Sequence, residues 1–223
     1  MAPIAVALDG PSGAGKSTIA RQAAQRLSFV YVDTGALYRA VGWYVIGKGA
    51  DPADAAAVAP LLAGLRIRFG YVDGVQHVYV NGQDVGDAIR TPEMSMAASA
   101  VSALPAVRAF LLECQRQAAR ENNVIMDGRD IGTVVLPHAA VKIFLTAAVE
   151  VRARRRLLEL QEKGTDVTYE QVLEDMRRRD ENDTNRAIAP LRQAADAVLL
   201  DTADLTLEQS VDAVVEIIRR AMP

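Results

Sequence analysis

Five short apolar runs are spaced along the chain and predict the strands of one parallel sheet. They lie at residues 4–8, 29–33, 124–127, 141–145 and 198–201. Helical periodicity fills much of the sequence between them, and strands that alternate with helices are typical of parallel sheets with right-handed crossovers. The last helix is the clearest, because apolar residues recur every three or four positions from Leu207 to Ile218, after a capping-box sequence that begins at Thr206. The pattern predicts an α/β fold, a parallel five-stranded sheet flanked by helices.

A first segment that interrupts this alternation lies at residues 36–96. It contains a helix and then apolar and polar residues in alternation at 65–69 and 77–80. An Asp-Gly pair at 73–74 and an Asn-Gly pair at 81–82 are hairpin signals. We therefore expect a small antiparallel sheet inside this insertion.

A second interruption, residues 151–187, reads as two helical runs. Gly164 separates them, and Thr168 with Gln171 has the capping-box spacing that starts a helix. The predicted organisation is a core at 1–35, 97–150 and 188–223, with insertions at 36–96 and 151–187.

Directly after the first strand, the chain has a complete phosphate-binding loop. It reads Gly10, Pro11, Ser12, Gly13, Ala14, Gly15, Lys16, Ser17, and Thr18 follows it. The glycines let backbone N–H groups turn toward phosphate oxygens at the start of the next helix. Lys16 is expected to reach the β- and γ-phosphates, and the Ser17 hydroxyl to ligate the Mg²⁺ that accompanies them. The loop predicts binding of a nucleoside triphosphate.

A second candidate segment, Asp33 to Arg39, follows the second strand, at the edge where open α/β sheets hold ligands. Arg39 suits a fork-like contact to phosphate, and Tyr38 suits stacking or packing. Tyr38 as a core residue and Arg39 as a solvated helix residue fit equally well. This segment alone leaves both interpretations open.

Further motifs follow in a consistent order. Residues 123–133 form a strand that breaks into a glycine turn with two carboxylates and an arginine, and arginine-rich stretches lie at 152–156 and 177–186. With all its motifs together, the chain resembles the bacterial cytidylate kinases, the CMP- and dCMP-specific branch of the nucleoside monophosphate kinases. The motifs that carry the resemblance lie at 9–18, 33–39, 127–133, 141–145, 160–164 and 185–191. They span nearly the whole chain.

The resemblance implies that Ser99, Arg108 and Asp130 hold the base. A carboxylate for the N4 amino group and a guanidinium for N3 suit cytosine. Uracil inverts this pattern and would leave Asp130 without a donor, and sites built on such hydrogen bonds reject the wrong partner strongly.

The resemblance also assigns the other parts of the substrates. Arg39, Arg129 and Arg186 would hold the CMP phosphate, Arg179 and Asp183 the ribose hydroxyls, and Thr34 and Tyr38 would line the pocket. The catalytic set would be Lys16, Arg129, Arg179 and Arg186, with residues 36–96 as the monophosphate-binding part and 151–187 as a lid. Arginines suit this chemistry because they hold phosphate bidentately and stabilise charge on the group in transfer.

The basic residues of the lid also have an ordinary explanation. Residues 151–186 contain nine Lys/Arg and nine Asp/Glu, so the segment is locally neutral and most of its charges are expected to form surface pairs. Arg179 and Arg186 match family positions. For Arg155, a contact to ATP as the closing arginine and a surface role are equally open.

Other classes of protein fit less well. A regulatory GTPase would need an Asn/Thr-Lys-x-Asp motif to read guanine, and this chain lacks one. Another small-molecule P-loop kinase, of the UMP/CMP or shikimate type, would keep Lys16, although a shikimate-type enzyme has no use for the cytosine set. A non-catalytic nucleotide sensor would bind ATP without turnover.

Composition agrees with a metabolic enzyme. The 223 residues are half apolar and carry a net charge of −3, which argues against a nucleic-acid binder. Cys114 is expected to be a buried small hydrophobe, and His77 and His138 to be structural. Without a signal peptide, lipid site or apolar membrane span, we expect a cytoplasmic monomer that acts on ATP and CMP or dCMP, with no nucleic-acid or membrane partner.

Overall fold

The computed structural model describes residues 3–72, 75–162 and 164–222. The chain forms two compact units: the first includes the chain up to Tyr31 and from Asn122 onward, and the second is Val32–Glu121. The insertion at 36–96 lies inside the second unit, which continues to Glu121. The division into a core, a monophosphate-binding part and a lid stays a prediction about function.

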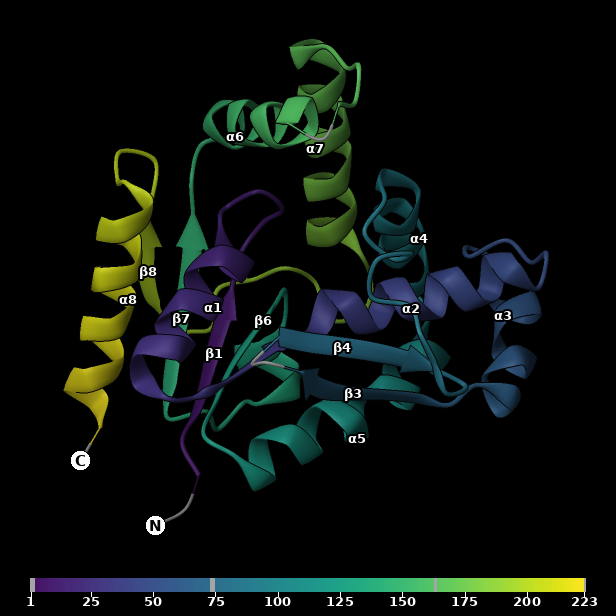
Figure 1. Cartoon of the computed structure of the whole chain (residues 1–223), viewed down its shortest axis with the longest axis horizontal. Helices are drawn as coiled ribbons and strands as arrows, with labels where there is room; N and C mark the ends of the chain where they lie inside the picture. Colours follow the sequence, from purple (N-terminus) through teal and green to yellow (C-terminus); the bar gives the residue numbers. More distant parts are fainter. Residues whose placement is uncertain (1–2, 73–74, 163, 223) are drawn as a thin grey trace. The chain divides into compact units, whose positions relative to one another are not determined.

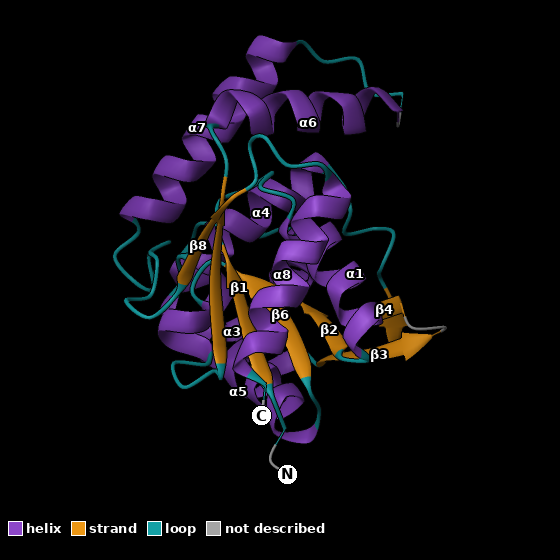
Figure 2. Ribbon diagram, turned by 90° about the vertical axis from the view of Figure 1, so that its left-hand side faces the viewer, coloured by secondary structure: helices purple, strands orange, loops and turns teal. Residues whose placement is uncertain are grey.

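All five predicted strands are present and form one parallel sheet. They are β1 (Ala5–Asp9), β2 (Val30–Asp33), β6 (Val124–Gly128), β7 (Val141–Thr146) and β8 (Val198–Asp201). Their order is β2-β6-β1-β7-β8, and Figure 2 labels β2, β6, β1 and β8 across this sheet. β1 is parallel to both neighbours, and Val6 lies opposite Ile125 and Val141. The predicted fold class is confirmed.

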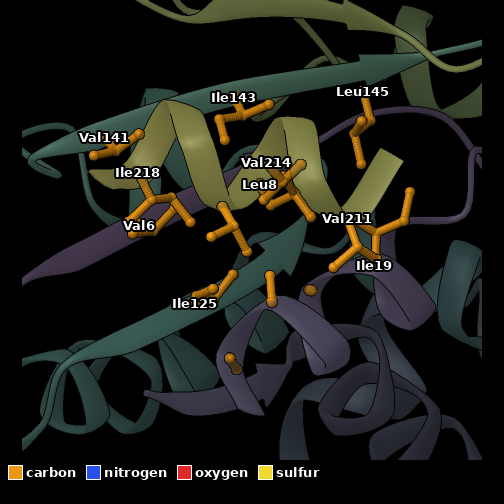
Figure 3. Packing of buried hydrophobic residues seen from close by; sticks show 14 of the residues in the cluster. Val6, Leu8, Ile19, Ile125, Val141, Ile143, Leu145, Val211, Val214 and Ile218 are labelled. Carbon is orange, nitrogen blue, oxygen red and sulfur yellow. The ribbon is translucent and has the colours of Figure 1, made fainter. Parts of the chain in front are cut away.

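The core of the first unit lies between the sheet and two helices, α1 (Lys16–Leu27) and α8 (Leu207–Ala221). Figure 3 shows Leu8 and Ile143 from the sheet packed against Val214 and Ile218 from α8. The capping box predicted at Thr206 forms, and the predicted apolar stripe is buried from Val211 to Ile218, whereas Leu207 at its start is exposed. Burial of this stripe against the sheet holds the helix in place.

The two helices predicted in residues 151–187 are α6 (Val149–Glu162) and α7 (Tyr169–Asn185), which pack against each other (Figure 1). They share a small apolar cluster that includes Leu160 and Met176. Gly164 has φ +73°, and Thr168 and Gln171 form both bonds of a capping box. The positive φ lets glycine end one helix and reverse the chain before the next.

The second unit contains four α-helices and a small sheet in its described residues. Its elements are α2 (Thr34–Gly47), α3 (Ala55–Leu61), the 3-10 turn η1 (Leu62–Gly64), β3 (Ile67–Val72), β4 (Val75–Val80), β5 (Gln83–Asp84), α4 (Pro92–Ser102) and α5 (Pro105–Glu121). The antiparallel order β3-β4-β5 confirms the predicted small sheet. Asn81 and Gly82 form the second turn with positive φ, as the Asn-Gly signal indicates. The Asp73-Gly74 turn lies outside the described residues.

Apolar side chains from these helices and from β4 form a separate core in the second unit. Leu37, Val41, Val80 and Leu111 are among its fully or almost fully buried members. In the described ranges, no single helix is long and apolar enough to cross a membrane. Only α4 and α5 taken together, with a bend of 101° between them, meet the criteria of length and composition.

Candidate active site

The phosphate-binding loop leaves the carboxyl end of β1, in the middle of the sheet. Gly10 has φ +151°, and a Cβ there would lie 2.1 Å from the carbonyl oxygen of Leu145, so only glycine lets the loop pass this close to β7. α1 begins at Lys16 with Gly15 as its N-cap. The first N–H groups of a helix have no partner within it, so loop and helix end can together bind an anion. The predicted strand, loop and helix are confirmed.

Lys16 is buried inside its own loop, where Nζ donates to the Pro11 carbonyl oxygen at 2.6 Å. Burial, and then the positive charge of Arg129, hold the pKa of Lys16 well below its ordinary value, although nearby carboxylates oppose this. A phosphate beside Nζ would favour the ammonium form. This environment suits a lysine that meets phosphate oxygens.

Ser17 lies beside a carboxylate that the sequence analysis did not select. The Ser17 hydroxyl donates to Asp127 Oδ2 at 2.7 Å, and the Tyr31 hydroxyl donates to Asp127 Oδ1 at 3.2 Å. Asp127 is near the end of β6, opposite Leu8 of the neighbouring strand. A carboxylate at the end of a buried strand could have indicated this residue in the sequence. Its role becomes clear only in the structure, because β6 pairs with β1 and so brings Asp127 close to Ser17.

Hydroxyl and carboxylate oxygens are the ligands that Mg²⁺ prefers, so Ser17 and Asp127 fit this ion. Across the described ranges, no group of three or more His, Cys, Asp or Glu side chains could hold a metal alone. Mg²⁺ usually keeps several waters and binds one or two carboxylates together with substrate phosphates. The pair therefore suits a metal that arrives with a nucleotide.

Asp9, at the end of β1, supports the turn that follows β6. Its two carboxylate oxygens accept from the backbone N–H groups of Ile131 and Gly132, at 2.8 and 2.7 Å. This turn is the π-helical segment η2 (Ile131–Val135), where a simple glycine turn was expected. Burial raises the pKa of Asp9 to about 6, against the effect of these two N–H groups. Through these bonds Asp9 positions the chain immediately after Asp130.

Four of the predicted substrate residues form one charged network in the first unit. Arg129 Nε donates to Asp183 Oδ2 at 2.8 Å, and Arg186 Nη1 lies 3.9 Å from Asp183 Oδ1. Arg186 Nη2 also lies 3.5 Å from Asp130 Oδ1. The turn after β6 and the end of α7 are thus joined by alternating charges.

Arg179 belongs to the same electrostatic environment, one helical turn before Asp183 on α7. Burial acts to raise the pKa of Asp183, but Arg129, and after it Arg186 and Arg179, hold this pKa below its ordinary value. Asp183 is therefore ionised at neutral pH. Its carboxylate holds the guanidinium groups of Arg129 and Arg186 close together.

Arg155, the predicted closing arginine, contacts the loop after β8. Its guanidinium donates to the Thr202 carbonyl oxygen at 2.5 Å and to Thr202 Oγ1 at 3.2 Å. The contact to ATP stays a prediction. One turn earlier, Arg152 is buried and bonds to the carbonyl oxygen of Ser12 in the phosphate-binding loop, a contact that the locally neutral sequence did not reveal.

In the second unit, Asp33 organises two arginines. It caps α2 by accepting from Ala36 N, and its Oδ2 lies 2.9 Å from Arg39 Nη2 and 3.4 Å from Arg90 Nη1. Burial acts to raise the pKa of Asp33, but Arg39 and then Arg90 hold it below its ordinary value. The solvated role left open for Arg39 is wrong, because its side chain is only 19% exposed. Sequence analysis missed Arg90. Thr34 is the buried first residue of α2.

Tyr38, Ser99 and Arg108 are also brought together within the second unit. The Arg108 guanidinium carbon lies 5.7 Å from the centre of the Tyr38 ring. Arg108 Nη1 donates to the Ser102 carbonyl oxygen at 3.2 Å, and the Ser102 hydroxyl donates to the Ser99 carbonyl oxygen at 2.9 Å. Tyr38 is therefore a core residue that also contacts a candidate base-binding arginine. The core interpretation of Tyr38 is confirmed, and its role toward a ligand stays a prediction.

The remaining candidates have simple environments. His77 Nδ1 lies 2.6 Å from Asp84 Oδ2 across the small sheet, and His138 is exposed. Cys114 is only half-buried, so the prediction of a buried residue was too strong; burial raises the pKa of its thiol. A thiol with a raised pKa is a poor nucleophile at neutral pH.

A phosphate-binding loop of this form at the end of a central parallel strand is typical of the P-loop nucleotide-binding folds. A solved structure, an uncharacterised protein from Eubacterium ventriosum, matches at the level of fold. It has a TM-score of 0.53 and 13% identity, and the match covers 97% of this chain and 98% of that one. The fold and the loop together place the protein among the P-loop nucleotide-binding proteins.

The chain belongs to the cytidylate kinase family, whose model matches residues 6–220. A cytidylate kinase from Caldicellulosiruptor bescii is 48% identical over 97% of this chain and 96% of its own length. Those from Carboxydothermus hydrogenoformans and Geobacter sulfurreducens are 50% and 49% identical, over 96% and 98% of this chain and 97% and 95% of their own. The resemblance found in the sequence is confirmed, and the protein is a phosphotransferase.

Proposed function

We propose that this chain transfers the γ-phosphoryl group of ATP to CMP and dCMP, giving CDP and dCDP. The observation that carries the proposal is membership of the cytidylate kinase family over nearly the whole chain. The environments of Lys16, Arg129 and Asp130 support the proposal, because each side chain is buried or half-buried and has the charge that its proposed contact needs. Lys16 and Arg129 are cations that suit phosphate, and Asp130 is a carboxylate that suits the N4 amino group. ATP and CMP occur together in the cytoplasm, which we propose as the location.

The first unit would bind ATP and act on the group in transfer. The loop from Gly10 to Thr18 would hold the triphosphate, and Lys16 would exchange the Pro11 carbonyl oxygen for phosphate oxygens. Mg²⁺ held by Ser17, with Asp127 behind it, would neutralise charge on the β- and γ-phosphates. Arg129, Arg179 and Arg186 would stabilise charge on the transferring group; Arg155 would contact ATP. Catalysis then rests on positioning and electrostatics.

The family resemblance assigns each part of CMP to named residues. Arg39 would bind the phosphate, Thr34 and Tyr38 would line the pocket, and Ser99 and Arg108 would read the base. Asp130 would accept from the N4 amino group, Arg129 and Arg186 would bind the phosphate, and Arg179 and Asp183 the ribose. Rejection of UMP follows, because its O4 would face a buried carboxylate.

The proposal is tested by a panel of acceptors, CMP, dCMP, UMP, AMP and shikimate, each with ATP and Mg²⁺. ADP formation and the phosphorylated product are both measured. We expect the highest kcat/KM with CMP and dCMP, and a loss of about 10²–10³-fold in the Lys16→Ala variant purified in the same way. Turnover with CMP no better than with AMP or shikimate would contradict the proposal. ATP binding without acceptor-dependent turnover would indicate a nucleotide sensor.

A further inference from the structure

Arg152, in the first turn of α6, connects three segments of the first unit through one buried guanidinium. Its Nε donates to the Ala147 carbonyl oxygen after β7, at 2.8 Å. Its Nη1 donates to the Ser12 carbonyl oxygen of the phosphate-binding loop, also at 2.8 Å. Both Nη atoms face the Asp180 carboxylate on α7, at 3.2 and 2.6 Å. Sheet, loop and both lid helices thus meet at this side chain.

This arrangement is too specific for an incidental surface pair. The Arg152 side chain is 5% exposed, and that of Asp180 is 24% exposed. A buried guanidinium is costly unless it is paired and hydrogen-bonded, and here a bidentate carboxylate and two backbone carbonyl groups meet both requirements. Lysine cannot reproduce the planar fork that reaches all three partners. The contacts therefore depend on arginine at this position.

The phosphate-binding loop packs closely against both helices at the same place. Gly13 has φ +74°, and a Cβ there would lie 2.3 Å from Met176 Cε on α7 and 3.2 Å from Arg152 Cβ on α6. Ser12, whose carbonyl oxygen accepts from Arg152, is the preceding residue. A shift of either helix would therefore displace the loop backbone that is proposed to bind the phosphates.

Asp180 lies next to Arg179 on α7 and one turn from Asp183, and both of these are proposed to contact CMP. We propose that Arg152 and Asp180 are a positioning pair, which holds α7 in the register that presents Arg179 and Asp183 while it fixes the loop backbone at Ser12. The pair would couple the position of the loop that binds the ATP phosphates to the position of Arg179 and Asp183, which are proposed to contact CMP. This inference rests on the proposed function and adds two residues to its machinery.

The chain offers a matched control on the same two helices. Arg177 on α7 and Glu150 on α6 form an ion pair at 3.3 Å, with side chains that are 55% and 50% exposed. This pair joins α6 to α7 as the proposed pair does, but neither residue has a described bond to the phosphate-binding loop. Surface pairs of this kind contribute little to stability. Loss of this pair tests whether linking the helices is sufficient.

The experiment compares Asp180→Asn, Asp180→Glu and Arg152→Lys with the control Glu150→Gln. Steady-state kcat and KM for ATP and CMP are measured, together with the melting temperature and the Kd of ATP without acceptor. We expect Asp180→Asn and Arg152→Lys to lower kcat at least tenfold and to weaken ATP binding severalfold. Asp180→Glu, which keeps the carboxylate, should recover part of kcat, and Glu150→Gln should stay within twofold of the parent protein.

The double variant of Arg152→Lys and Asp180→Asn should lose no more activity than the worse single variant, because both changes break one connection. Kinetic constants within twofold of the parent for Asp180→Asn and Arg152→Lys would overturn the proposal. So would an equal loss in Glu150→Gln, or losses that follow the melting temperature alone. If the parent protein fails to phosphorylate CMP while Asp180→Asn still weakens ATP binding, the proposed function fails and the coupling to the loop stands.

Discussion

Replacing Asp130 with asparagine tests base recognition, the part of the proposed function that separates CMP from UMP. The substitution keeps the size and shape of a side chain that is 6% exposed. It removes the negative charge and supplies an amide that can donate as well as accept. The N4 amino group of cytosine would lose a charged acceptor, whereas O4 of uracil would gain a donor.

The expected magnitude follows from the surroundings of Asp130. A charge-assisted hydrogen bond that becomes neutral or is lost in a buried site costs about 1–3 kcal/mol. That range corresponds to roughly 5- to 150-fold in kcat/KM for CMP. Arg186 Nη2, 3.5 Å from Asp130 Oδ1, also loses its partner charge, but this effect acts on the phosphate side and is shared by CMP and UMP. The ratio of the two kcat/KM values therefore isolates the base contact, and we expect it to fall at least fivefold.

The assay measures initial rates with CMP and UMP at saturating ATP, for the parent protein, Asp130→Asn and a control. Asp183→Asn is the matched control, because Asp183 is a buried carboxylate of the same network whose proposed contact is the ribose. We expect it to lower kcat/KM for both substrates with little change in their ratio. Equal losses on CMP and UMP in Asp130→Asn would refute the reasoning and would assign Asp130 to the phosphates or to the turn after β6.

Three further predictions test other parts of the site and the fold. Lys16→Ala should lower kcat/KM by about 10²–10³-fold, the effect of losing one preorganised electrostatic group. Its melting temperature should not fall, because the substitution removes a buried amine whose pKa is depressed; a folded variant with most of its activity would contradict this role. Burial raises the pKa of Asp9 from an ordinary 3.8 to about 6, so the folded protein favours the protonated carboxyl group. The contribution of Asp9 to the free energy of unfolding should therefore fall by up to roughly 3 kcal/mol as the pH rises from about 4 to above 6. Urea unfolding at pH 4 to 7 should show this fall in the free energy of unfolding for the parent protein and not for Asp9→Asn. The same dependence on pH in both proteins would contradict the prediction. Ile218→Ala should cost about 2–5 kcal/mol in the free energy of unfolding, whereas Leu207→Ala, 47% exposed on the same helix, should cost less than about 1 kcal/mol; similar costs would contradict the packing of α8.

Sequence analysis predicted those parts of the fold that are determined by residues close together along the chain. The strand, glycine loop and helix around Lys16 form one contiguous motif, and the apolar stripe of α8 is visible as periodicity. Family motifs likewise indicated Arg129, Asp130, Asp183 and Arg186, which the structure joins through close charge contacts. The first two predictions needed only residue type and spacing along the chain, whereas these four residues were given by the family resemblance.

The residues that sequence reasoning missed acquire their roles from distant segments. Asp127 matters because β6 pairs with β1 and brings it to Ser17, and Arg90 matters because it shares Asp33 with Arg39. In residues 151–186 the equal numbers of acidic and basic residues do not show which arginine is buried. The structure separates them. Arg178 forms an exposed pair with Asp175 and the partly exposed Arg156 a pair with Glu159, as expected for most of this segment, while Arg152 is buried.

The central place of β1 in the sheet has a consequence for how the protein is made. β1 leaves the ribosome before either of the strands that flank it, because Val6 lies opposite Ile125 and Val141, more than a hundred residues further along the chain. At roughly 5–20 residues per second, the nascent β1 waits several seconds for its partners. The intervening Val32–Glu121 unit has an apolar core of its own, and its flanking residues Val30 and Asn123 are joined by a backbone hydrogen bond of 2.8 Å. If this unit folds as it emerges, it draws the chain ends on either side of it together and shortens the search by which β6 finds β1. The same unit that would recognise CMP would then also act as an internal folding aid for the strand that carries the phosphate-binding loop.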